Sequence, residues 1–189
     1  MMKPFLFTKF LLFVLFPSLV WAQDPVQVQD KGSAILEASL NGKLIKFERK
    51  LGATMIKENN SLTIMGQTSD DIFNAQNILL NISSVNLDTK ISKGEYKIVP
   101  EDDATTYLVR AEYVDRSGGN GSYWWSNASV VKGGSIIIEE ITDTHIKGKF
   151  SFTGVFENED GSMNAKNLVK VTKGVFDLPL EIRSVLDPQ

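Results

Sequence analysis

Cysteine is absent from the 189-residue sequence. Its absence excludes disulfide bonds, thiolate metal sites and a cysteine nucleophile. It also excludes a lipid-modified cysteine, so we expect a protein that is not lipid-anchored. A chain without disulfides depends on its hydrophobic core for stability, and this chain is long enough to bury one.

Catalytic motifs are absent as well. The single histidine, His145, falls in a predicted turn, where a surface role is expected. There is no Gly-x-Ser-x-Gly or His-Glu-x-x-His motif, and the glycine-rich residues 118–121 are not followed by the Lys-Ser/Thr of a phosphate-binding loop. We therefore predict a non-enzymatic protein with no catalytic residue, no cofactor and no metal site. A carboxylate pair assembled by folding, or calcium binding at the acidic loops 101–103 and 158–162, stays open.

The sequence also lacks a basic stripe and a long hydrophobic run. Residues 1–22 have the features of a signal peptide, with Lys3 and Lys9, apolar residues 10–16, and Val20-Trp21-Ala22 before the cleavage point. The apolar run is far shorter than the roughly 20 residues of a transmembrane helix. Removal of the two lysines changes the formal net charge from −3 to −5. We expect export to the periplasm or the exterior, no membrane insertion after signal removal, and no nucleic-acid binding.

The clearest pattern that is present lies in residues 133–156. From Ile146 to Phe156, apolar residues and glycines alternate with lysine, serine and threonine, which is the period of a strand with one buried face. An isoleucine-rich segment at 135–141 comes before it, and the residues between have turn chemistry. These residues predict a long β-hairpin on which the other strands build.

Further hairpins and turns are predicted on either side. Asn41-Gly42 separates two apolar runs, which is the strongest short signal for a type I′ hairpin turn. Residues 53–57 and 61–67 predict a second hairpin. Residues 68–75 are predicted to hold a single helical turn with its cap at Ser69-Asp70-Asp71. Gly174 is expected at a bulge or bend between the last two strands.

About ten short strands with turns between them predict an all-β fold. We expect an antiparallel β-barrel, lipocalin- or calycin-like, or a two-sheet β-sandwich. Gly148 and Gly154 on the inner face favour the barrel, because they permit the strong bending that closure needs. The expected organisation has four parts: a signal peptide at 1–22, a flexible leader at 23–33, a single all-β domain at 34–182 and a frayed tail at 183–189.

Four short stretches carry a family resemblance. They are Leu40-Asn41-Gly42-Lys43, Gly94-Glu95-Tyr96, the segment Gly148-Lys149-Phe150-Ser151-Phe152-Thr153, and Gly174-Val175-Phe176. On these the chain resembles a family of small exported β-rich proteins of unknown function from Gram-negative bacteria. The resemblance implies an all-β fold and export, and it implies no activity. Members of that family often carry a lipid-anchoring cysteine, which this chain lacks.

Tyr123-Trp124-Trp125 is the strongest candidate site. On a strand, Trp124 points opposite to Tyr123 and Trp125, so one face carries exposed aromatic surface unless something covers it. Flat aromatics beside a loop rich in glycine, serine and asparagine suit a sugar ring or an apolar ligand. The other interpretation is that these side chains plug the end of the barrel. Tyr113 and Arg110 could extend the patch.

These observations lead to two hypotheses about function. The first is an exported binding domain for a small apolar molecule in a barrel mouth or for a glycan on the aromatic loop. The alternative is a structural or assembly protein of the cell envelope, which pairs with an envelope protein through an exposed edge strand.

Overall fold

The computed structural model describes residues 34–184, which form a single mixed sheet of eleven strands and one short 3-10 helix. The predicted signal peptide, the predicted leader and residues 185–189 of the predicted tail lie outside the described residues. Among residues 34–184, no helix is long and apolar enough to cross a membrane.

The strands and the helix follow each other in this order: β1 (Ile35–Leu40), β2 (Lys43–Lys46), β3 (Arg49–Ile56), β4 (Ser61–Gln67), β5 (Gln76–Ser84), β6 (Gly94–Lys97), η1 (Glu101–Asp103), β7 (Tyr107–Asp115), β8 (Ser122–Ser126), β9 (Ser135–Ile141), β10 (His145–Glu157) and β11 (Met163–Arg183). The prediction of an all-β fold is confirmed. The last strand extends to Arg183, one residue beyond the expected end of the domain.

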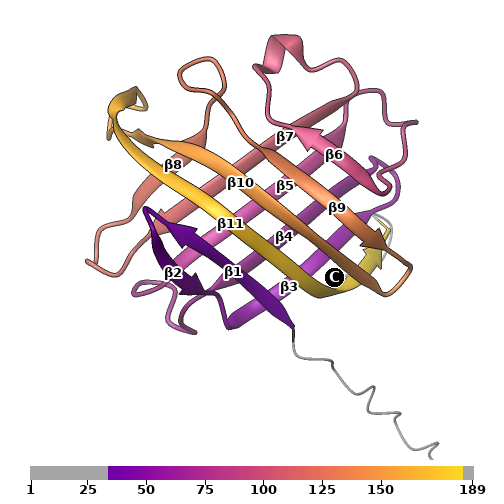
Figure 1. Ribbon diagram of the computed structural model, residues 1–189, viewed down its shortest axis with the longest axis horizontal. Helices are drawn as coiled ribbons and strands as arrows, with labels where there is room; N and C mark the ends of the chain where they lie inside the picture. Colours follow the sequence, from indigo (N-terminus) through magenta and orange to yellow (C-terminus); the bar gives the residue numbers. More distant parts are fainter. Residues whose placement is uncertain (1–33, 185–189) are drawn as a thin grey trace, which may run out of the picture. The chain divides into compact units, whose positions relative to one another are not determined.

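The sheet curls into a ring. Its order is β2-β1-β11-β3-β4-β5-β7-β8-β10-β9-β6, and an additional pairing of β10 with β11 joins seven of these strands into the ring. In Figure 1, β10 and β11 pass in front of β3, β4, β5 and β7 and cross them, which gives two layers with the core between. All pairs are antiparallel except one: the 21-residue β11 runs past β1, and its end at Leu180–Arg183 pairs in parallel with β3.

The predicted organising hairpin is present. β9 pairs with the first half of β10, from Ile146 to Ser151, and β8 pairs with the second half, from Gly154 to Phe156. The expected alternation holds from Ile146 to Gly154 and then breaks, because Val155 is also buried and the β10–β11 register shifts there. Because of this bulge, Phe156 does not continue the alternation of buried and exposed residues along β10. Its ring instead contacts Trp124.

Close packing accounts for the two inner-face glycines. A Cβ atom on Gly148 would overlap Cζ of Phe176, and one on Gly154 would lie 2.7 Å from Cβ of Trp124. Aromatic side chains from the neighbouring strands thus occupy the space that a larger residue would need. Space for these side chains, in addition to the predicted bending, requires glycine at both positions.

Most of the turns that the sequence predicts are present in the structure. Asn41 and Gly42 have φ of 48° and 89°, as a type I′ turn requires. A bulge or bend is predicted at Gly174; the structure has a bulge just before it, where Lys173 has φ of 50° and the register of β11 shifts against β10. The prediction of a helical turn at 68–75 is wrong, because these residues form a loop. The Asp71 carboxylate stabilises this loop by accepting hydrogen bonds from the backbone N–H of Phe73 and from Nδ2 of Asn74. The helical turn that does form is η1, in the acidic loop after Pro100.

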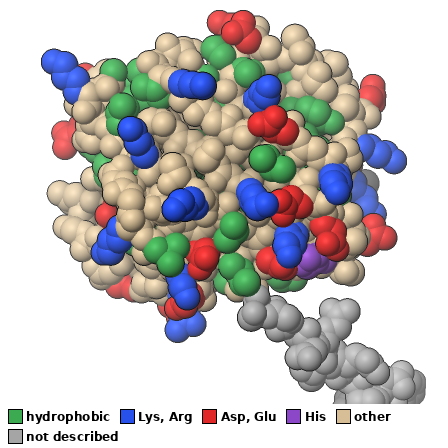
Figure 2. All heavy atoms as spheres, in the orientation of Figure 1, with side chains coloured by type: hydrophobic (Ala, Val, Ile, Leu, Met, Phe, Trp, Pro, Cys, Tyr) green, Lys and Arg blue, Asp and Glu red, His purple; other side chains and the backbone are tan. Residues whose placement is uncertain are grey.

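Charges of both signs are mixed over the face that β9, β10 and β11 present. Figure 2 shows lysine and arginine side chains interspersed with aspartate and glutamate on this face. On it Lys149 pairs with Glu139, and Lys147 lies 3.5 Å from Asp177. His145 Nε2 lies 2.6 Å from the same Asp177 carboxylate, so the single histidine belongs to a surface ion cluster.

Candidate functional site

The aromatic stretch lies on β8, between β7 and β10, and its side chains divide between the two faces of the sheet. Trp124 is inward and packs against the hydrophobic core. Tyr123 and Trp125 are on the outer face, opposite Val114 and Glu112 of β7. The predicted opposition of Trp124 to its two neighbours is confirmed, and it separates the candidate residues into different environments.

Two candidate residues, Tyr113 and Trp124, belong to the end of the core. Their rings are partners across β7 and β8, with centroids 5.5 Å apart, and Trp124 meets Phe156 edge-on at 5.4 Å. Burial, together with the nearby Asp115 carboxylate, raises the pKa of Tyr113, whose hydroxyl donates to that carboxylate at 3.4 Å. Trp124 Nε1 donates to Asn167 at 3.3 Å. These contacts give both rings a packing role.

A third candidate, Tyr123, lies on the outer face with Arg116. The guanidinium carbon is 5.6 Å from the centre of the Tyr123 ring, and Nη2 donates to the tyrosine hydroxyl at 3.2 Å. This cation–π contact covers one face of the ring.

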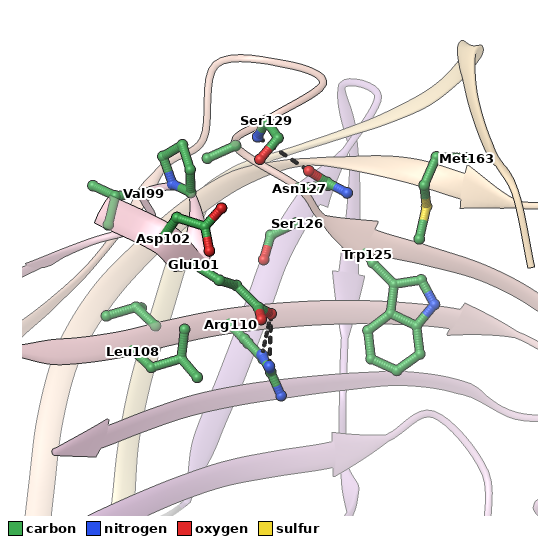
Figure 3. A pocket seen from close by; sticks show the side chains of 13 residues that line it. Val99, Glu101, Asp102, Leu108, Arg110, Trp125, Ser126, Asn127, Ser129 and Met163 are labelled. Atoms are coloured by element: carbon green, nitrogen blue, oxygen red, sulfur yellow. Dashed lines mark hydrogen bonds and ion pairs between the residues drawn. The ribbon is translucent and has the colours of Figure 1, made fainter. Parts of the chain in front are cut away.

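The remaining two candidates, Trp125 and Arg110, line one pocket. It has a volume of about 430 Å³ and lies between the outer face of β7 and β8, the loop around η1, and the start of β11. Figure 3 shows Glu101 and Arg110 in the middle of this pocket, with Trp125 and Met163 on one side. We call it the tryptophan pocket. Two of the five predicted site residues therefore share this pocket, whereas Tyr113 and Trp124 contact each other at the end of the core.

Side-chain interactions fix the main groups of the tryptophan pocket. Arg110 donates to Oε1 of Glu101 through Nη2 at 2.6 Å and through Nε at 3.1 Å. Trp125 Nε1 donates to Oε2 of Glu157 at 2.5 Å, which orients the indole ring. The bond to Glu157 orients the Trp125 ring before any ligand arrives, and such preorganisation lowers the entropic cost of binding. The Arg110–Glu101 pair is more than half exposed, so it holds its side chains less firmly.

Short polar side chains complete the lining. Ser126 Oγ accepts the backbone N–H of Ala111 at 2.8 Å, and Asn127 Oδ1 accepts that of Ser129 at 3.0 Å. Asp102 also lines the pocket. An aromatic ring, a carboxylate, an ion pair and several amide or hydroxyl groups thus surround one space, a combination that offers both stacking and hydrogen bonds.

Glu112 does not line the tryptophan pocket but neighbours Trp125, and it was not among the site residues predicted from the sequence. It is directly opposite Trp125 on the outer face of β7. Burial raises the pKa of Glu112 above its ordinary value, Arg116 opposes this shift, and Glu157 adds to it. Its position in the alternation of β7, two residues from Arg110, was the only available signal. Glu101 was considered only as part of an acidic loop that could bind calcium, not as a partner of Arg110, and Glu157 was missed because it lies 32 residues from Trp125 in the chain.

Fold and site together define the class of this protein: an all-β domain with a packed interior and a polar, aromatic pocket on its outer face. The chain belongs to the family described as a domain of unknown function, DUF6252, whose family model matches residues 32–178. No curated protein and no solved structure matches the chain.

Proposed function

We propose that this protein is a non-enzymatic binding domain that holds a glycan in the tryptophan pocket. The observation that carries the proposal is the position of Trp125 beside the Arg110–Glu101 pair in a space of about 430 Å³. A sugar ring offers an apolar face that stacks on an indole and an edge of hydroxyl groups that donate and accept hydrogen bonds. The pocket supplies partners for both.

The packing of the interior favours a glycan over a small apolar molecule. The space between the two layers holds fully buried side chains from both of them, including Leu62, Leu80 and Phe176. An apolar ligand in a barrel mouth would have to displace such side chains. The tryptophan pocket is instead open on the outer face and has a mixed lining.

The edge strands give less support to the assembly hypothesis. The sheet ends at β2 and β6, and each of these strands is four residues long and carries lysine. Short, charged edges are typical of strands that resist pairing with another chain. Leu44 of β2, which is 56% exposed, is the one feature of these edges that favours a protein contact.

We further propose that the domain acts after export, as residues 1–22 suggest. A glycan-binding domain of this kind would meet its ligand in the cell envelope or outside the cell.

Tryptophan fluorescence tests the proposal directly. Without residues 1–22, the chain keeps only Trp124 and Trp125 of its three tryptophans. In a Trp124→Phe variant, Trp125 is the single reporter, and we expect its emission to change saturably with neutral oligosaccharides. The Trp125→Ala variant should lose at least about tenfold in affinity, which corresponds to roughly 1.4 kcal/mol.

Other results would favour the other hypotheses. A saturable response to fatty acids, with none to any saccharide, would replace the glycan by an apolar ligand. Self-association seen by size-exclusion chromatography with light scattering, without any ligand response, would favour assembly. Unchanged saccharide affinity in Trp125→Ala would remove the tryptophan pocket from the proposal.

A further inference from the structure

A second pocket lies on the same outer face, on the other side of Glu112. It has a volume of about 170 Å³ and is lined by side chains of β4, β5 and β7 and by the residue that follows β7. Those used below are Met65, Gln67, Asn77, Glu112, Val114 and Arg116. We call it the amide pocket.

Two oxygen atoms in the lining of the amide pocket lack a partner. Oε1 of Gln67 and Oδ1 of Asn77 are buried and have no hydrogen-bond partner within residues 34–184. Gln67 as a whole is only 9% exposed. A buried polar atom without a partner costs free energy, so such atoms are rare in folded proteins and point to a missing partner.

The two oxygens belong to one cross-strand row. Gln67 of β4 is opposite Asn77 of β5, and Asn77 is opposite Val114 of β7. The row therefore ends beside Tyr123 of β8, which is opposite Val114.

The tryptophan pocket and the amide pocket lie in line along β7. Leu108 and Arg110 line the first, and Glu112, Val114 and Arg116 line the second. From Arg110 to Val114 an extended strand advances about 13 Å. Trp125, which lines the first pocket, is the cross-strand partner of Glu112, which lines the second. One elongated ligand that follows β7 would reach both.

The charged side chains that line the amide pocket favour a neutral ligand group. A cation would be repelled by Arg116, and an anion would be repelled by Glu112. The free oxygens of Gln67 and Asn77 need a donor, whereas the Arg116 guanidinium, which donates to the Tyr123 hydroxyl, has further N–H groups that can donate to an acceptor. A hydroxyl group is neutral and can do both.

We propose that the amide pocket is a second sugar subsite, so that the domain binds a neutral oligosaccharide along β7 rather than a single sugar. This proposal rests on the proposed function of the tryptophan pocket. Hydroxyl groups of the second sugar donate to Gln67 and Asn77, while the first sugar stacks on Trp125. The ligand thereby satisfies the two buried oxygens that the free protein leaves unpaired.

A length series of saccharides combined with one pair of variants tests the second subsite. We would measure the affinity of monosaccharides to hexasaccharides for the wild type, Gln67→Met and Gln76→Met by calorimetry. Methionine has nearly the volume of glutamine and lacks the buried oxygen. Gln76 is the matched control because it lies on the neighbouring strand, donates to Asp115 at 3.2 Å and is not among the residues that line either pocket.

We expect affinity to rise with length until both pockets are filled. Gln67→Met should weaken the binding of long saccharides about fivefold to tenfold, leave short ones unchanged, and raise the urea midpoint because an unpaired polar atom is removed. Gln76→Met should leave both affinities unchanged.

Three outcomes would overturn the second subsite. In one, a monosaccharide binds as tightly as any longer ligand. In another, Gln67→Met has no effect on the binding of long saccharides, as expected if water alone satisfies the oxygens. In the third, Gln67→Met weakens short and long saccharides equally. If no saccharide of any length binds, the proposed function itself fails, and that result is distinct from all three.

Discussion

Phe176 of β11 lies directly against Gly148 of β10, its partner across the two strands. The relationship is reciprocal, because the ring of Phe150 on β10 covers Gly174 on β11, where an added Cβ would be 2.6 Å from the ring. The two phenylalanine rings stack with centroids 6.4 Å apart. Each strand thus supplies one aromatic ring and one glycine that receives the ring of the other, and this pairing locks the register of the long hairpin.

Substitution of Gly148 should therefore destabilise the fold. In Gly148→Ala the new Cβ would overlap both the ring of Phe176 and the backbone oxygen of Ile137, so ring and backbone must both move. We expect a loss of at least about 2 kcal/mol in the free energy of unfolding, measured with urea. Gly52→Ala is the control, because a Cβ on Gly52 of β3 meets nothing within 4 Å. A loss in Gly148→Ala no larger than in this control would contradict the packing argument.

Much of the fold could be predicted because alternation is a local signal. The strand at 146–154, the Asn41-Gly42 turn and the bulge before Gly174 depend on residues that are neighbours in sequence. The pairing of β3 with β11 depends on two segments more than 120 residues apart, and no local pattern encodes it. The same holds for the change of partner along β10, from β9 to β8.

In the candidate site, too, some residues could be predicted from local sequence and others could not. Trp125 was predicted because three adjacent aromatics are conspicuous in the sequence, and Arg110 because it lies on the polar face of an alternating strand. Gln67 and Asn77 give no such signal, since single amide residues are common on strands. They become informative only when the register of β4, β5 and β7 buries both oxygens in one row.

The two adjacent tryptophans should differ in their contribution to stability. Trp124→Ala removes the contacts with Tyr113 and Phe156 at the end of the core, and we expect a cost of about 3 kcal/mol. Trp125→Ala acts on the outer face, where the residue lies opposite Val155 of β10, and should cost about 1 kcal/mol. Urea unfolding followed by circular dichroism measures both. Equal costs would show that Trp125 is as much a part of the core as Trp124.

Ionisation of Glu112 should lower the free energy of unfolding as the pH rises. Burial raises its pKa in the folded state, so the folded protein holds this proton more tightly than the unfolded chain does. Its contribution is therefore most favourable below the ordinary glutamate pKa of 4.5 and declines as the pH rises through the folded-state pKa. Glu112→Gln should gain stability relative to the wild type over this range, as measured by urea unfolding from about pH 4 to about pH 8.

Glu181 provides a control of opposite sign for this experiment. The hydrogen bond from Arg183 lowers the pKa of Glu181, so Glu181→Gln should lose stability relative to the wild type as the pH rises toward and above about 4.5. If both variants changed in the same direction with pH, burial would not be the cause of the effect at Glu112.

Asp177 should stabilise the protein at neutral pH and lose this contribution in acid. The hydrogen bond with His145 is the main cause that lowers the pKa of Asp177, and Lys147 adds to it. A carboxyl group with a lowered pKa stabilises the fold above its ordinary pKa of 3.8, and the contribution disappears as the pH falls through the folded-state value. Asp177→Asn should therefore cost up to about 1 kcal/mol at about pH 6, a small value because solvent screens the pair.

The pH dependence of this cost and a direct titration together check the assignment. The difference in unfolding free energy between Asp177→Asn and the wild type should vanish once the pH falls below the lowered folded-state pKa of Asp177, because the carboxyl group is then protonated in both states. In His145→Ala the pKa of Asp177, followed by NMR, should rise toward its ordinary value of 3.8, because the principal hydrogen bond is gone. A pKa that stayed low without His145 would assign the shift to Lys147 instead.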